Sequence, residues 1–218
     1  MSAPTSPFLA LPIELRYAIY DRLCLSDFQS YPYTQPSPIA AIDTTKPPRS
    51  LLLVNHTIHS EISTYYFARC TFRFIAQGLS NPNNISNITK MPVGSQNVIR
   101  QMRKAELLLI PGRTMAPLST PLPYLGTRGM SGLWLARHVR LLRDEALELR
   151  IVVVSVRKVS WNTEWSMREE MEALLKALEE LAGKVEFRLG EVMGPTGTEK
   201  DMRDELGVAL DKLNGQSV

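Results

Sequence analysis

The 218-residue sequence predicts an α+β or α/β fold, in which two N-terminal helices precede a small, mostly parallel sheet of strand–helix units. Apolar residues recur at helical spacing in two segments before residue 66. Beyond residue 71, short apolar runs typical of strands alternate with segments of helical periodicity. This alternation favours parallel pairing, because each intervening helix carries the chain back to start the next strand in the same direction.

The first N-terminal helix is predicted over residues 12–25. Pro12 suits a first helical turn, where its missing N–H is no loss, and Glu14 lies near the positive end of the helix dipole. The apolar side chains form two adjacent stripes, Leu15, Ile19 and Leu23 in one and Ile13, Tyr17, Tyr20 and Cys24 in the other. Together they cover about half of the circumference, which is wide for a helix packed on one side. Either the fold encloses this helix, or one stripe is left for a partner.

A proline-rich segment separates the first helix from the second. Residues 26–50 hold five prolines and no regular period, so we expect a loop there. The second helix is predicted from Ser50, whose hydroxyl suits an N-cap. Its apolar residues recur three or four positions apart at Leu51, Val54, Ile58, Ile62 and Tyr65. The apolar face of this helix should pack against the first helix.

The later part of the chain contains four strand candidates, at residues 72–75, 105–110, 149–154 and 185–189. The third is apolar on both faces, as in a strand covered on both sides, whereas the fourth alternates and suits a sheet edge. Helices are predicted from Ser131, from a capping box that starts at Ser166, and over a final segment from Met202 to Leu213. Gly183 suits the left-handed residue that follows a helix.

These elements predict two regions. Residues 8–75 form a helical module that carries the insert 26–50, and residues 76–214 form the strand–helix region. Because the strand at 72–75 directly follows the second helix, we expect the two regions to share one core.

The net charge of +3 is unevenly distributed. Residues 1–89 carry +1, residues 90–158 carry +8 and residues 159–218 carry −6. A basic region can mark a surface for nucleic acid or an acidic partner, and Trp134 beside arginines can stack on bases. The arginines are spread over several predicted elements, however, and a large aromatic on a helix is usually buried. We therefore interpret Trp134 as core and the charges as solvated faces that partly neutralise each other, and nucleic acid is not favoured.

The composition and the first residues of the sequence indicate where in the cell the protein is located. Only two cysteines occur, the first residues lack the basic and apolar segments of a signal peptide, and no apolar run approaches the roughly 18 residues of a membrane span. We expect an intracellular protein of the cytoplasm or nucleus, with no membrane partner.

No motif indicates catalysis. His56 and His59 can share a helix face near Glu61 and Cys70, but zinc needs four ligands, and no second Cys or His pair stands at a suitable spacing. Residues 194–200 join a strand to a helix, yet they lack the glycine spacing and the Gly-Lys-Ser/Thr ending of a phosphate loop. We therefore predict no catalytic residue, no cofactor and no metal site.

Two phrases in the first third of the chain form a longer pattern. Residues 11–20 read Leu-Pro-x-Glu-Leu-Arg-x-x-Ile-Tyr, and residues 51–61 read Leu-Leu-x-Val-x-x-x-Ile-x-x-Glu. Thr-Phe-x-Phe follows at residues 71–74. Together these phrases resemble the F-box-like domains that are abundant in fungal proteins.

The resemblance implies a non-catalytic adaptor. In F-box proteins the N-terminal helical motif docks on the Skp-type linker subunit of a cullin ubiquitin ligase, and the C-terminal region selects a substrate protein. Carried over to this sequence, the partner-binding residues would be Leu11, Pro12, Leu15, Ile19 and Leu23. The resemblance does not name the substrate.

Two other functions stay open. The helices can simply complete the fold of an interaction scaffold, whose basic middle region binds an acidic partner or nucleic acid. An enzyme would need a pocket that gathers His56, His59 or His138.

Overall fold

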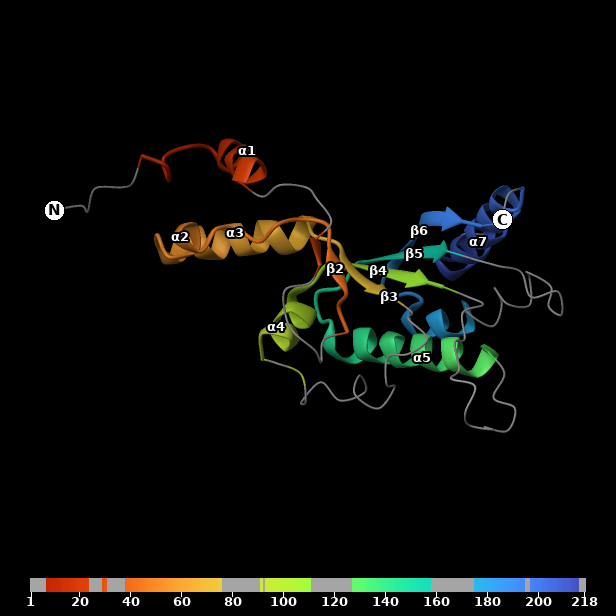
Figure 1. Ribbon diagram of the computed structural model, residues 1–218. Coiled ribbons are helices and arrows are strands. Elements are labelled where there is room, and N and C mark those ends of the chain that lie inside the picture. Colours follow the sequence, from red (N-terminus) through yellow and green to blue (C-terminus); the bar gives the residue numbers. More distant parts are fainter. Residues whose placement is uncertain are drawn as a thin grey trace.

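The computed structural model describes residues 7–23, 29–30, 38–75, 91, 93–110, 127–157, 175–194 and 197–215. Within them, six strands form one sheet in sequence order (Figure 1). They are β1 (Gln29–Ser30), β2 (Ala41–Ile42), β3 (Phe72–Ile75), β4 (Lys104–Leu109), β5 (Ile151–Arg157) and β6 (Glu186–Met193). The pairs β1–β2 and β2–β3 are antiparallel, and β3 to β6 run parallel. The predicted mostly parallel sheet is confirmed.

Helices connect the parallel strands. In chain order, α4 (Val93–Gln101), α5 (Thr127–Glu145) and the 3-10 helix η2 (Ala177–Leu181) each follow one strand and precede the next. Figure 1 shows α4 and α5 beneath the sheet, and α7 (Glu199–Leu213) beside β6. The chain therefore has the α/β organisation that the alternating sequence pattern predicts. None of the described helices combines the length and apolar character that a membrane crossing needs.

The main core lies between the sheet and these helices. Phe72, Phe74 and Leu107 are buried in the same cluster as Leu135 and Leu142 of α5. Core residues of one strand lie two positions apart, because successive side chains of a strand point to opposite faces of the sheet.

At Phe187, an amide side chain bonds the free edge of β6. The backbone N–H of Phe187 donates to Oδ1 of Asn214 at 2.8 Å, and Nδ2 of Asn214 donates to the carbonyl oxygen of Phe187 at 2.9 Å. Asn214 thereby satisfies the backbone groups that an adjacent strand would otherwise bond. Within the described sheet, β6 is an edge strand, as its alternating sequence predicts.

The predicted second helix is divided in two. The structure has α2 (Arg49–Leu52) and α3 (His56–Arg69), with a break that ends at Asn55. Ser50 is not the N-cap; it lies inside α2. The Asn55 side chain accepts a hydrogen bond from the N–H of Ile58 at 2.8 Å and caps α3. The apolar period continues across the break, so periodicity alone did not reveal it.

Two short strands occupy part of the segment predicted as a loop. Within residues 26–50, β2 is held beside β3 by hydrogen bonds from the N–H of Ala40 to Arg73 and from the N–H of Asp43 to Thr71. A strand of two residues is too short to show an alternating pattern, so its pairing partner determines it.

The helix starts also differ from the expected ones. α5 begins at Thr127, four positions before Ser131, and α4 was not predicted at all. The capping box at Ser166 lies outside the described residues. Gly183 has a φ of 75°, so the left-handed conformation expected after the helix is confirmed.

The buried apolar residues form two clusters. The smaller contains Tyr20, Ile62 and Tyr65 and lies between α1 (Ile13–Leu23) and α3. α3 belongs to both clusters, because Tyr66 and Cys70 are part of the main core. α1 is therefore attached to the protein through α3 and lies beside that helix, outside the sheet (Figure 1).

Candidate protein-interaction surface

α1 begins immediately after Pro12. The carbonyl oxygen of Pro12 accepts hydrogen bonds from the N–H groups of Leu15 and Arg16, at 3.1 and 3.2 Å. Pro12 is thus the last residue before the helix, where it needs no N–H of its own. The predicted start of the helix is correct to within one residue.

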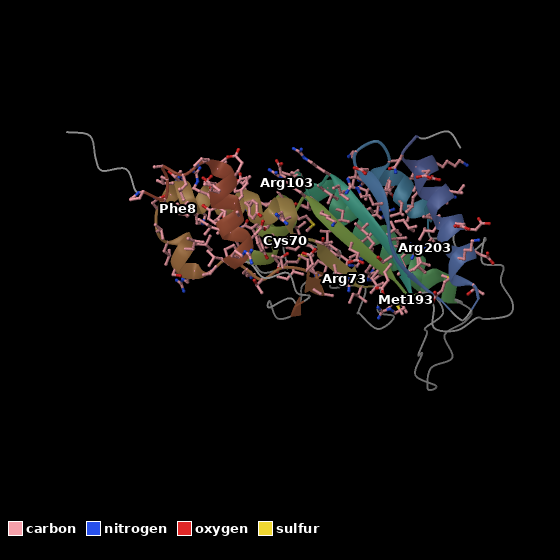
Figure 2. All side chains as sticks on the ribbon, turned by 90° about the horizontal axis from the view of Figure 1, so that it is seen from above. Phe8, Cys70, Arg73, Arg103, Met193 and Arg203 are labelled. Carbon is pink, nitrogen blue, oxygen red and sulfur yellow. The ribbon has the colours of Figure 1, made fainter. Side chains whose placement is uncertain are left out.

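One side of α1 packs against α3. Tyr20 is fully buried, and its ring lies 5.8 Å from that of Tyr65. The Tyr17 ring lies closer to that of Tyr65, at 4.5 Å and tilted by 31°, and Phe8 covers Tyr20 from the preceding turn at 6.0 Å. Figure 2 shows Phe8 among the N-terminal helices, away from the strands. Aromatic contacts therefore fix the tyrosine side of α1.

The other apolar side of α1 is exposed. Leu15 is 52% exposed, Ile19 38% and Leu23 42%; we call these three residues the α1 stripe. They lie four positions apart and therefore follow one another along the same side of the helix. Pro12 is also exposed, and Leu11 is half-buried. These are the five residues to which the F-box-like resemblance assigns partner binding.

The second predicted stripe, which holds Tyr17 and Tyr20, is mostly covered. Tyr20 is buried and Tyr17 half-buried, while Ile13, at the start of the helix, is 41% exposed. Cys24 lies outside the described residues. α3 thus covers the tyrosines and leaves the α1 stripe open.

An ion pair holds α1 against α3. Nε of Arg16 donates to Oε1 of Glu61 at 2.9 Å, and Nη2 donates to Oε2 at 2.9 Å. Both side chains are largely buried. Such a two-point contact fixes orientation as well as distance. The hydrogen bond from Arg16 to the Glu61 carboxylate also raises the pKa of the guanidinium.

The same two residues reach further groups. Nη1 of Arg16 donates to the carbonyl oxygens of Leu9 and Leu11, which ties the turn before α1 to the helix. The Tyr20 hydroxyl donates to Glu61 at 3.2 Å. Burial, together with the Glu61 carboxylate, raises the pKa of Tyr20 to about 12. Tyr20 therefore stays protonated and serves as a donor.

A second polar contact lies on the other side of the tyrosines. The Tyr65 hydroxyl donates to Asp21, and Nη1 of Arg69 donates to Oδ2 of Asp21 at 3.0 Å. Burial and the hydrogen bond to Asp21 raise the pKa of Tyr65 to about 12. Arg69 and Asp21 are about half exposed, so solvent weakens their attraction. The Arg16–Glu61 pair is thus the better shielded of the two contacts.

The Arg16–Glu61 contact was missed from the sequence, although both residues stand in the quoted phrases. Arg16 and Tyr20 belong to the first phrase and Glu61 to the second, and all three form one hydrogen-bonded unit. The available signal was an arginine in the first predicted helix and a glutamate in the second, two helices that were expected to pack together. Glu61 was assigned to the second phrase and to the surroundings of His56 and His59, without a partner on the first helix.

The structure separates His56 and His59, which line one pocket on α3, from the other residues of the conceivable metal site. His56 and His59 are exposed on α3, Glu61 points toward α1, and Cys70 is buried in the main core. Within the described parts of the chain, no three or more His, Cys, Asp or Glu side chains gather where they could hold a metal ion.

His138 is a core residue of α5. It is 1% exposed, and its ring lies 3.9 Å from that of Trp134. Nδ1 is 2.8 Å from the Trp134 carbonyl oxygen, to which it donates in the tautomer that carries its proton there. Burial lowers the pKa of His138 to about 4. The expectation that Trp134 belongs to the core is confirmed.

The charged regions neutralise each other in part, as expected. Arg143 and Arg140 of the basic middle region pair with Glu180 at 2.5 and 3.7 Å, and Arg157 pairs with Glu191 at 3.3 Å. In the turn before α7, the N–H of Gly194 donates to the Glu199 carboxylate at 3.3 Å. That backbone donor is thus engaged by the protein itself.

Comparisons with protein-family models, with curated proteins and with solved structures found no match. The F-box-like resemblance therefore stays a prediction that rests on the two quoted phrases.

Proposed function

We propose that this protein is a non-catalytic interaction module that acts as an F-box-type substrate adaptor, and that the α1 stripe docks on the Skp-type linker subunit of a cullin ubiquitin ligase. The observation that carries the proposal is the exposure of Leu15, Ile19 and Leu23 on a helix whose opposite side is fixed. Apolar anchors every four residues are the pattern by which a helix enters an apolar groove.

The size of the surface favours a grooved partner. A stable interface buries about 800 Å² on each side, more than three aliphatic side chains supply on a flat contact. Two copies of this chain that met stripe to stripe would therefore bury too little. A groove that also takes up Leu11 and Pro12 from the preceding turn brings the interface closer to that size.

The alternative function has less support. An electrostatic scaffold requires free positive charge in the basic middle region, and Arg140, Arg143 and Arg157 are paired with carboxylates. A titration of salt tests it directly, because contacts with a polyanion weaken steeply with ionic strength.

Binding to a purified Skp-type subunit, measured by calorimetry, tests the proposal. Leu15→Asp should weaken binding at least ten-fold, since it places a charge in an apolar groove. Val208→Asp is the matched control, because Val208 of α7 is also 52% exposed on a helix. The control should bind like the unchanged protein. No binding by the intact, folded chain, or equal losses in the two variants, would reject the proposal.

A further inference from the structure

Arg22 lies on the outer side of α1, beside the α1 stripe. Its side chain is exposed, and it follows the buried Tyr20 by two positions. Two positions turn a helix by about 200°, so Arg22 points nearly opposite to Tyr20 and away from α3. Seven positions separate it from Leu15, which amounts to almost two full turns and places both on the same side. Figure 1 shows this helix at the surface, with α3 beneath it.

The neighbours of Arg22 on α1 do not neutralise its charge. An acidic side chain three or four positions earlier could pair with it, but these positions hold Ile19 and Ala18. Asp21 is adjacent in the sequence, yet its carboxylate is bonded by Arg69 of α3 at 3.0 Å. The helix itself therefore gives Arg22 no counterion.

Arg22 differs in this respect from the other arginines of the helix pair. α1 and α3 contain three arginines, of which Arg16 pairs with Glu61 and Arg69 pairs with Asp21. Arg22 forms no ion pair with any residue that the structure describes. Its place in the last turn of α1 suits a cation, because the helix dipole is negative there. The dipole nevertheless leaves the guanidinium in solvent, where a partner can reach it.

The α1 stripe by itself does not define a direction. Its three aliphatic side chains are evenly spaced, so a helix turned end to end would place apolar groups at the same three points of a groove. Arg22 breaks this symmetry, because it lies three positions after the central Ile19. The equivalent position before Ile19 is Arg16, which is largely buried and turned to Glu61. A charge near one end of the stripe can therefore select the orientation of α1.

We propose that the groove of the Skp-type subunit carries an aspartate or glutamate side chain that pairs with Arg22 and sets the direction of α1, an inference that rests on the adaptor function proposed above. Docking of the α1 stripe also covers the guanidinium beside it and removes water from it. A covered charge is tolerated where an opposite charge and hydrogen bonds replace that water. A carboxylate does this in a two-point contact, which fixes orientation as well as distance. The carboxylate lies at the end of the groove that receives the last turn of α1.

Calorimetry with a purified Skp-type subunit tests this contact. Arg22→Glu should weaken binding about ten-fold or more, because two carboxylates would then face each other. Arg22→Met keeps an apolar stem without the charge; it should weaken binding less and make the affinity less sensitive to salt. Arg203→Glu is the matched control, because Arg203 is exposed on α7 and the substitution changes the net charge equally. This control should bind like the unchanged protein.

A charge exchange identifies the partner group. Each surface aspartate and glutamate of the subunit is changed to lysine in turn, and one of these variants should bind the unchanged protein poorly and recover binding to Arg22→Glu. Equal binding by Arg22→Glu and Arg203→Glu, or recovery by none of the lysine variants, would overturn the inference. The adaptor function would stand in that case if Leu15→Asp still abolished binding, whereas both proposals fall if the unchanged, folded protein does not bind. Thermal unfolding of each variant shows that it is folded.

Discussion

Arg16 of α1 and Glu61 of α3 form a two-point ion pair across 45 sequence positions, with both N–O distances at 2.9 Å. The pair lies at the edge of the tyrosine contacts and also fixes the turn before α1 through Arg16. Together with the tyrosine contacts, it determines which side of α1 faces α3 and, as a consequence, which side is presented to solvent.

Loss of this ion pair should loosen α1 without unfolding the sheet. Glu61→Gln keeps the size of the side chain but removes the charge that holds Arg16 and accepts from Tyr20. Hydrogen exchange of α1 amides should become at least ten-fold faster, while β4 and β5 keep their protection, because α1 belongs to the smaller cluster. Glu205→Gln, at an exposed position of α7, should change neither. Unchanged exchange in α1 after Glu61→Gln would contradict this role.

His138 should make the stability depend on pH. Its pKa of about 4 in the folded protein lies below the ordinary value of 6.5, so folding favours the neutral ring. The stabilisation is complete above pH 6.5 and is lost as the pH falls toward 4. This group alone should lower the free energy of unfolding by about 2 kcal/mol between pH 7.5 and pH 5.

Urea unfolding at several pH values measures this effect. His138→Gln should be less stable at pH 7.5 but should show a flatter decline toward pH 5. His59→Gln, at an exposed position, should keep the decline of the unchanged protein. An equal decline in His138→Gln would show that other groups control the acid sensitivity.

Gly190 should not accept a side chain. A Cβ atom there would overlap the Ser155 hydroxyl and lie 2.7 Å from a methyl carbon of Val153, at an irregularity in the β5–β6 pairing. Gly190→Ala should destabilise the protein by about 2 kcal/mol, because the Ser155 hydroxyl and the Val153 methyl group would have to move. Gly207→Ala is the contrasting control, since its Cβ would meet open space on α7. It should stabilise the protein by about 1 kcal/mol in urea unfolding. Equal effects would refute the steric explanation.

The contributions of Arg73 and Glu106 to stability should depend on each other. They are paired residues of β3 and β4, joined at 2.7 Å, and Glu106 also accepts from the Ser155 hydroxyl at 2.6 Å. Arg73→Met leaves a buried carboxylate without its cation and should cost about 3 kcal/mol. Adding Glu106→Leu should restore much of that stability, as a double-mutant cycle in urea would measure. Additive losses would show that the pair is not coupled.

The candidate surface was only partly predictable. The five residues from Leu11 to Leu23 follow from the sequence phrase, because a helix start and an apolar period are local properties. The polar contact that orients them does not, because Arg16 and Glu61 meet only after α1 and α3 have packed.

The sequence by itself determined the helical start at Pro12, the parallel strands and their alternation with helices. Periodicity and residue propensity depend on a few neighbouring residues, so they can be recognised from the sequence without knowledge of the fold. The tertiary structure decided which stripe of α1 is covered and that Ala41 and Ile42 join the sheet. Each of these depends on a partner far away in the chain. The tyrosines of α1 are buried because they pack against Ile62 and Tyr65 of α3. Leu15, Ile19 and Leu23 stay exposed because no described element packs over them.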